Sequence, residues 1–249
     1  MKKPLLIVII VIAVLGVSLY FLKRDKGELI PVETPIVIPP EEEIVVGPTA
    51  FCYERFSAPN EYGAIDKYTL RMIIDGNKAT GELNFLPAEK DRKIGEFEGT
   101  VTPVNQTTKS RTANLWWFTS GEGMNVKEEL KILLEEGEAS IGFGEMTERE
   151  DGSYVYKDPA NVSYNLKLTG IPCDDLTERV NVEAYLRENI SELSPVKPVF
   201  GGAWYLVSVT VEMDKNTGTV TYEDGHIQEN RTFSYSTNDK REVTSLTIK

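Results

Sequence analysis

The chain has 249 residues, of which 41% are hydrophobic and 27% charged, and its formal net charge is −12. So acidic a chain argues against binding of nucleic acid and against direct adhesion to anionic lipid, because both carry negative charge. One histidine and two cysteines are too few for a zinc site, and we expect no metal and no cofactor.

The N-terminus carries nineteen consecutive uncharged residues, 4–22, with basic residues on both sides. As a helix this run would be roughly 28 Å long, about the thickness of the hydrocarbon core of a bilayer. A cleaved signal peptide is the alternative, because Gly16 to Ser18 resemble a cleavage site. The apolar run continues beyond them to Leu22, however. We therefore expect residues 1–3 to be a cytoplasmic stub and residues 4–22 a single transmembrane helix in the lipid bilayer.

Residues 23–49 contain five prolines and the acidic triplet Glu41 to Glu43. Proline disfavours a helix interior and a central strand, and proline-rich chains run extended at ~3.1 Å per residue. We expect a solvated stalk here. A docking site for a proline-binding domain is the alternative.

Residues 50–173 consist of short apolar runs broken by Gly, Pro and Asp, which is typical of an antiparallel β-sandwich or barrel. The expected strands are 68–74, 78–86, 96–104, 112–119, 139–146 and 162–168. Asp75 to Asn77 form a turn signal between the first two strands. Residues 126–135 fit either a helix or a strand, and the turn at Gly137 slightly favours a strand in a hairpin.

Cys52 and Cys173 lie at the two ends of this β-rich domain. If they are bonded, they close a loop of roughly 120 residues, which is worth roughly 5 kcal/mol in the chain-entropy model. Two separate buried thiols are the alternative. A disulfide needs an oxidising compartment. Charge alone does not orient residues 4–22, because both flanks are basic, so the cysteines favour a cytoplasmic N-terminus and extracytoplasmic domains.

The pattern of residues 174–249 predicts a second unit of the α+β class, with one helix packed on a small antiparallel sheet. The helix is expected from Asp174 to Ser194, with Asn181 able to cap it and Pro195 ending it. Its apolar residues fall at helical spacing. They are Val182, Tyr185, Leu186, Ile190 and Leu193.

The sheet of this unit is predicted from three patterns. Apolar residues alternate strictly between 205 and 213, which indicates a strand. Asp224 and Gly225 predict a two-residue hairpin turn, and residues 246–248 end the chain as a last strand. The complete fold is therefore expected to be mainly β, with a transmembrane helix before it and an α+β tail after it.

Several segments resemble a family of membrane-tethered bacterial proteins that has no assigned activity. The matching segments are 95–99, 115–118, 142–146, 154–159 and 222–227, the last reading YEDGHI. The resemblance implies a location at the cell envelope and assigns no catalytic residue. The tail is also similar in outline to cystatin-like rolls, which is a likeness of architecture only.

Glu223 and His226 are one candidate site. In a two-residue hairpin they would face each other across the strands, as a carboxylate-oriented base or a pH-sensitive contact. The alternative is an exposed hairpin tip that needs Gly225 for its positive φ. A base without a nucleophile or an oxyanion donor does not make an active site, so we expect no catalytic residues.

Trp116 and Trp117 are the other candidate site. Successive side chains of a strand point to opposite faces, so one tryptophan can lie in a core while the other is exposed, covered or part of an interface. An exposed tryptophan could bind a glycan or anchor a partner protein. A carboxylate cluster, Glu145, Glu148, Glu150 and Asp151, could bind Ca²⁺ or hydrolyse glycosides, but it is more simply a solvated face.

These patterns predict a single-pass membrane protein whose extracytoplasmic domains form a non-catalytic binding or structural module of the cell envelope. The expected partners are the bilayer, through residues 4–22, and an envelope protein or glycan. An inhibitor or sensor of extracellular hydrolases is the alternative, followed by an envelope hydrolase that uses paired carboxylates.

Overall fold

The computed structural model describes residues 47–88, 92–121 and 123–249. The cytoplasmic stub and transmembrane helix predicted over residues 1–22, and almost all of the stalk predicted over 23–49, lie outside these residues. Within the described ranges, no helix is both long and apolar enough to cross a membrane.

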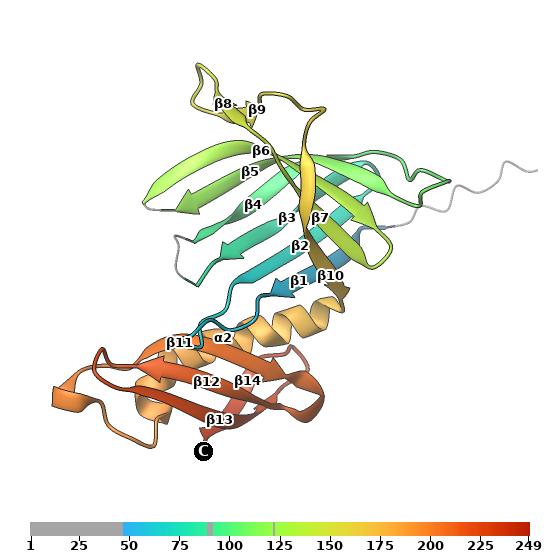
Figure 1. Ribbon diagram of the computed structural model, residues 1–249. Coiled ribbons are helices and arrows are strands. Elements are labelled where there is room, and N and C mark those ends of the chain that lie inside the picture. The colour runs from blue at the N-terminus through green and yellow to red at the C-terminus, as the bar shows by residue number, and fades with distance from the viewer. Residues whose placement is uncertain (1–46, 89–91, 122) are drawn as a thin grey trace, which may run out of the picture. The chain divides into compact units, whose positions relative to one another are not determined.

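Eight antiparallel strands close into a barrel (Figure 1). They are β1 (Thr49–Phe56), β2 (Lys67–Asp75), β3 (Lys78–Leu86), β4 (Lys93–Val101), β5 (Arg111–Gly121), β6 (Met124–Glu135), β7 (Glu138–Phe143) and β10 (Ser163–Ile171). Neighbours in sequence pair from β1 to β7, and β10 pairs with both β7 and β1 to close the ring. The predicted β-rich domain is thus a barrel rather than a sandwich, and residues 126–135 are strand.

Two short strands lie outside the ring. They are β8 (Met146–Glu148) and β9 (Tyr154–Tyr156). β9 pairs with β8 and, in parallel, with β6 at Glu128. The strand predicted over 139–146 is therefore wrong at its end, because β7 stops at Phe143 and Met146 begins a different strand.

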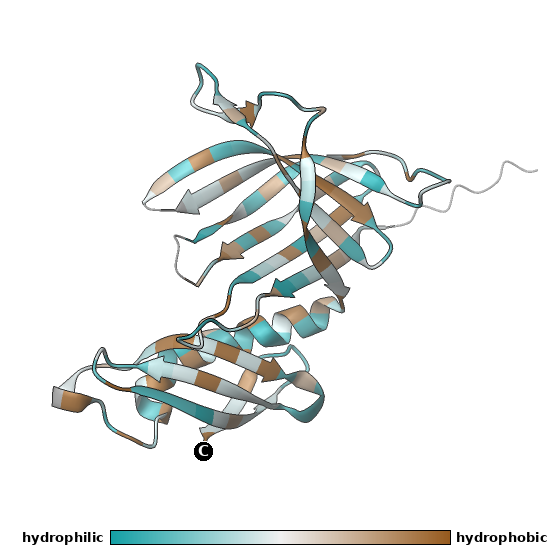
Figure 2. Cartoon of the chain, viewed as in Figure 1, coloured by the Kyte–Doolittle hydropathy of each residue, from teal (hydrophilic) through white to brown (hydrophobic). Residues whose placement is uncertain are grey.

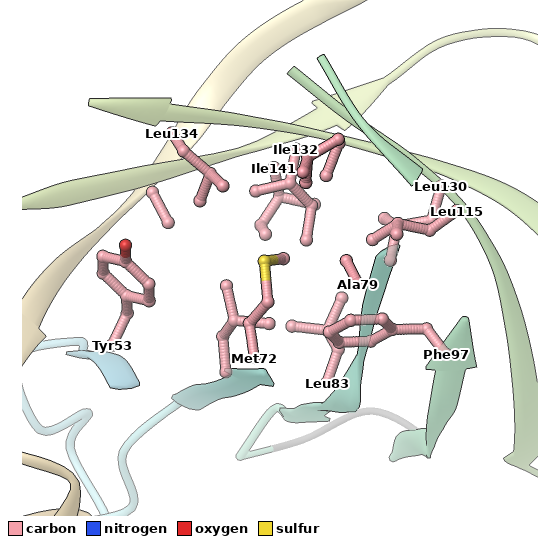
Figure 3. Close-up of a cluster of buried hydrophobic side chains, with 14 of the residues drawn as sticks. Tyr53, Met72, Ala79, Leu83, Phe97, Leu115, Leu130, Ile132, Leu134 and Ile141 are labelled. Carbon is pink, nitrogen blue, oxygen red and sulfur yellow. The ribbon is translucent and has the colours of Figure 1, made fainter. Parts of the chain in front are cut away.

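The barrel core follows from the alternation of apolar and polar residues along each strand (Figure 2). Inward side chains such as Leu70, Met72, Leu83 and Ile132 are fully buried. Figure 3 shows core side chains from opposite walls pointing toward one another. Eight strands enclose an interior about wide enough for side chains to fill.

Glycine at two inward positions allows neighbouring strands to approach closely. A Cβ added to Gly95 would lie 1.9 Å from the backbone oxygen of Phe118, and one added to Gly81 would lie 2.0 Å from that of Arg71. Such contacts are far inside van der Waals distance. The close approach of β3 to β2 and of β4 to β5 therefore depends on the absence of a side chain at these positions.

The tail is one helix on a four-stranded antiparallel sheet, which confirms the predicted small α+β unit. Its elements are α2 (Cys173–Leu193), β11 (Tyr205–Glu212), β12 (Thr217–Glu223), β13 (Gln228–Thr237) and β14 (Val243–Ile248), with short 3₁₀ helices at Val199–Gly201 and Met213–Lys215. Val182, Leu186 and Ile190 of α2 are buried in one cluster with the sheet.

Two details of the tail correct the sequence analysis. Asn181 lies inside α2 rather than at its start, and its side-chain amide donates to the backbone oxygen of Arg241 over 2.7 Å. A bulge between Leu206 and Ser208 interrupts the strict alternation predicted over 205–213. Tyr205 is consequently 63% exposed, out of phase with the buried Val209 and Val211 beyond the bulge.

Cys52 of β1 and Cys173, the first residue of α2, form the predicted disulfide, with their Cα atoms 5.1 Å apart. Ion pairs follow it along the helix. The Arg179 guanidinium lies 2.9 Å from the carboxylate of Glu54, and the Lys67 ammonium donates to Glu183 over 2.7 Å. These contacts join α2 to the outer surface of the first two barrel strands.

Candidate functional site

Trp117 points into the barrel and is 2% exposed. Its indole nitrogen donates to the backbone oxygen of Gly95 over 3.0 Å. Its ring meets Phe85 edge-on, with centroids 5.3 Å apart. Of the two alternatives for this residue, the structure supports a core residue.

Trp116 points out of the barrel, as the alternation of the strand requires. Its ring is covered by two cations, Lys127 at 4.6 Å and Arg149 at 5.8 Å from the ring centroid. These are cation–π contacts. Trp116 is therefore part of the outer surface, but its ring is not a bare platform for stacking.

A groove of about 470 Å³ lies on the outer surface of β3 to β6. Phe118, which is 43% exposed, is its most exposed apolar residue. The Lys127 ammonium also lies 5.7 Å from the centroid of the Phe118 ring, so one side of that ring is shared with Lys127. Ile94, Glu82, Glu96 and Lys127 contribute to the walls of the groove. We call this feature the outer groove.

Strand register explains why these side chains share one surface. Glu82 of β3 is directly opposite Glu96 of β4, and Glu96 is directly opposite Phe118 of β5. A second hollow of about 350 Å³ continues the outer groove toward β2, where Ile73 and Glu98 line it. Arg71 of β2, directly opposite Glu82, also lines this hollow. Apolar and acidic side chains thus share the surface with two cations, Arg71 and Lys127.

The charges of the outer groove are unbalanced. Like charges placed directly opposite on neighbouring strands are destabilising, as for Glu82 and Glu96. Glu82 accepts a hydrogen bond from Asn84 over 2.9 Å. Among the residues that the structure describes, no cation forms an ion pair with Glu96 or Glu98. Three glutamates, Glu82, Glu96 and Glu98, therefore face two cations, Arg71 and Lys127, and Glu96 and Glu98 keep their negative charge available to a partner.

Glu223 and His226 do not face each other. The β12–β13 connection has four residues rather than two, so Glu223 is paired with Gln228. The reason is Asp224, whose carboxylate accepts backbone hydrogen bonds from His226 over 2.8 Å, from Ile227 over 2.9 Å and from Val199. These bonds, the Ile227 amide first, hold the pKa of Asp224 below its ordinary value. The predicted hairpin pair is wrong.

The carboxylate cluster predicted near residue 150 is spread over separate contacts. Glu145 is ion-paired with Lys157 at 2.8 Å, and Asp151 accepts hydrogen bonds from the backbone and hydroxyl of Ser153. In the part of the chain that the structure describes, no three His, Cys, Asp or Glu side chains are grouped so that they could hold a metal ion.

No protein-family model matches the chain, and no curated protein and no solved structure is significantly similar to it. The resemblance to membrane-tethered bacterial proteins thus stays a prediction from the sequence.

Sequence reasoning singled out Trp116 but missed Phe118 and the carboxylates of the outer groove. Part of the signal was present. In the segment 95–99, Phe97 alternates with Glu96 and Glu98, which places both glutamates on the face opposite the core. The missing information was the register that brings β3, β4 and β5 together.

Proposed function

We propose that the described domains are the extracytoplasmic binding module of a single-pass membrane protein, and that the outer groove binds a basic segment of an envelope protein. The observation that carries this proposal is the combination of an exposed phenylalanine, Phe118, with the carboxylates of Glu96 and Glu98, which lack a cationic partner among the described residues.

Charge complementarity supports a basic partner. The whole chain carries −12, so a basic surface is attracted from a distance and is oriented by the glutamates of the outer groove. An aromatic residue that becomes fully desolvated on binding commonly supplies much of the affinity. Phe118 is the aromatic residue in a position to do so.

The disulfide supports an extracytoplasmic location, because such bonds persist in oxidising compartments. Location in the membrane rests on the sequence of residues 4–22. The non-catalytic assignment likewise remains part of the proposal, and no contact among the described residues favours the inhibitor or hydrolase alternatives over a binding module.

Photo-crosslinking tests the proposal. A benzophenone amino acid replaces Phe118 in the full chain in its native membrane, and Tyr205, exposed on the tail sheet, is replaced in the same way as a control. We expect the probe at position 118 to capture a discrete protein, less strongly at high salt because screening weakens surface charge pairs. The probe at position 205 should not capture it.

A charge reversal identifies the role of the glutamates. Changing both Glu96 and Glu98 to Lys should lower the crosslinking yield at position 118 at least tenfold. The matched control changes Asp239, an exposed residue of the β13–β14 loop, to Lys. Equal yields in both variants, or no discrete product at position 118, would contradict a basic partner in the outer groove.

A further inference from the structure

The barrel wall has an opening between β6 and β7. These strands pair only from Ile132 to Glu135 and from Glu138 to Ile141. Beyond this stretch the N-terminal half of β6 pairs with β9 at Glu128 instead, and β7 continues to Phe143 beside β10. The two strands therefore separate toward one end of the barrel.

Tyr156 of β9 lies at the point where the strands separate. Its hydroxyl donates to the backbone oxygen of Gly142 on β7 over 2.9 Å, and its backbone amide donates to the Glu129 carboxylate on β6 over 3.0 Å. The side chain is 6% exposed. Tyr156 thus links β6 to β7 where the strand ladder ends, and leaves a cavity beyond it.

This cavity has a volume of about 140 Å³. Its walls are mainly apolar and aromatic, and we call it the wall cavity. The apolar lining residues are Phe85, Trp117, Leu130, Ile141, Phe143 and Met146. Phe143 is 43% exposed at its edge and stacks on Phe85 with centroids 6.2 Å apart.

The size of the wall cavity limits what it can hold. Pockets for drug-sized ligands measure roughly 300–1,000 Å³, so the wall cavity is too small for one. An apolar cavity of about 150 Å³ is large enough to bind benzene. A single aromatic ring therefore matches the volume, and aromatic walls favour ring-to-ring contact.

Three charged side chains also line the wall cavity, Lys93, Glu128 and Glu129. The Glu129 carboxylate already accepts the Tyr156 backbone amide, which leaves Lys93 and Glu128 as a pair of opposite sign. The Lys93 ammonium is ion-paired with the Glu128 carboxylate and lies 4.9 Å from the centroid of the Trp117 ring. The Lys93 side chain is 38% exposed and that of Glu128 is 15% exposed. A charged ligand would pair with one of them and leave the other unpaired in a partly buried site, which is unfavourable.

We propose that the wall cavity is a binding site for a small ligand with one aromatic ring and a polar head of zero net charge, which donates to Glu128 and accepts from Lys93. The ring lies among Phe85, Trp117 and Phe143. The site is on the cavity side of β5 and β6, whereas the outer groove is on their outer surface, so this proposal is independent of the proposed function.

The test compares three probes that share one ring and differ in charge: benzyl alcohol, benzylamine as its cation, and phenylacetate. The full chain in mild detergent carries ¹³C-methyl methionine. Met146 reports on the wall cavity, while Met213 in the tail reports on non-specific effects. We expect benzyl alcohol to shift the Met146 signal saturably, with at least tenfold higher affinity than either ion, and to leave Met213 unchanged.

Two variants should change the charge preference. Lys93→Met leaves Glu128 unpaired and should favour the benzylamine cation, whereas Glu128→Gln leaves Lys93 unpaired and should favour phenylacetate. The signal of the buried Met72 shows whether each variant is folded. A Met146 signal that no probe shifts, equal affinity of the wild type for all three probes, or folded variants with the wild-type preference would overturn the proposal.

Discussion

Asp224 shows how one side chain determines a loop. Its side chain has no exposed surface. Its carboxylate accepts hydrogen bonds from two backbone amides of the loop, those of His226 and Ile227, and from the Val199 amide, which precedes β11. The loop and the preceding segment are therefore held together by one ionised group, whose pKa is lowered by the bonds that it accepts.

Replacing Asp224 by Asn should lower the melting temperature at pH 7, because the neutral amide of Asn accepts these hydrogen bonds more weakly than the negatively charged carboxylate does. The folded-state pKa lies below the ordinary value of 3.8. The carboxylate thus stabilises the fold above that value, and the stabilisation is lost as the pH falls through the lowered pKa. Melting curves from pH 7 to pH 2 should show the wild type and variant converging at the acid end.

His226→Ala is the control for this prediction. The His226 side chain is 58% exposed, so we expect a change of less than about 0.5 kcal/mol in the free energy of unfolding. A loss as large as that of Asp224→Asn would show that the imidazole contributes to the loop as much as the carboxylate does.

The same residue explains why the hairpin prediction failed. Asp-Gly is a strong local signal for a two-residue turn, and nothing near it in sequence reveals that Val199 will donate to Asp224. The tryptophan pair was more predictable, because alternation along a strand needs no distant partner. The covering of the Trp116 ring was not predictable, because Lys127 comes from β6 and Arg149 from the turn between β8 and β9.

At the scale of elements, the Tyr156 hydroxyl of β9 bonds to β7 where the backbone pairing of β6 with β7 has ended. Removing this hydroxyl, in Tyr156→Phe, leaves the buried oxygen of Gly142 without this donor. We expect a loss of about 1–3 kcal/mol in the free energy of unfolding, measured by urea denaturation at pH 7. Tyr205→Phe, at an exposed position, should be neutral.

Alkaline pH gives a second test of Tyr156. Burial raises the pKa of Tyr156 to about 12, and a backbone hydrogen bond from Lys131 offsets part of this increase. Because the folded-state pKa is above the ordinary value of 10.0, this group stabilises the fold below that value, and the stabilisation is lost as the pH rises toward the folded-state pKa. The wild type should lose stability over this range more steeply than Tyr156→Phe.

Gly95→Ala tests the close approach of β4 and β5. The added methyl group would lie 1.9 Å from the Phe118 backbone oxygen, so β4 and β5 would have to move apart. We expect a loss of at least about 1–3 kcal/mol in the free energy of unfolding, as for overpacked cores. Gly202→Ala, whose nearest contact would be 3.6 Å, should be nearly neutral. Equal stability of both variants would argue against this close approach.

Strands with clear alternation were predictable as elements. The expected 68–74 and 78–86 correspond to β2 and β3, and the turn between them is at Gly76, which has a φ of 59°. The ends of β7 and the existence of β8 and β9 were not predictable. Their limits are determined by where β6 changes partners, a property of the assembled barrel.

At the scale of the molecule, the disulfide joins the first barrel strand to the tail helix. Replacing both Cys52 and Cys173 by Ser should lower the free energy of unfolding by up to roughly 5 kcal/mol, since the closed loop is long. Urea denaturation of the oxidised, reduced and double-Ser forms measures this. The reduced and double-Ser forms should agree, and full stability in either would mean that the bond does not constrain the unfolded chain.

The order of the eight strands could not be read from the sequence, although their β character could. A barrel and a sandwich have the same alternation along each strand, and they differ in whether the first and last strands pair. That pairing joins Cys52 to Ile171 in register, and only the cysteines gave a sequence signal that these segments meet.

Because β1 pairs with β10, the barrel cannot close until β10 has been synthesised. The chain is made from its N-terminus at roughly 5–20 residues per second, so β1 precedes its partner by roughly 6–24 s. Until Ile171 is made, β1 and β7 are open edges, and open edges pair readily with other chains. The disulfide cannot form earlier either, because Cys173 follows β10. The nascent protein is thus most exposed to aggregation just before the ring closes, and it gains the closing pair and the covalent bond almost at once.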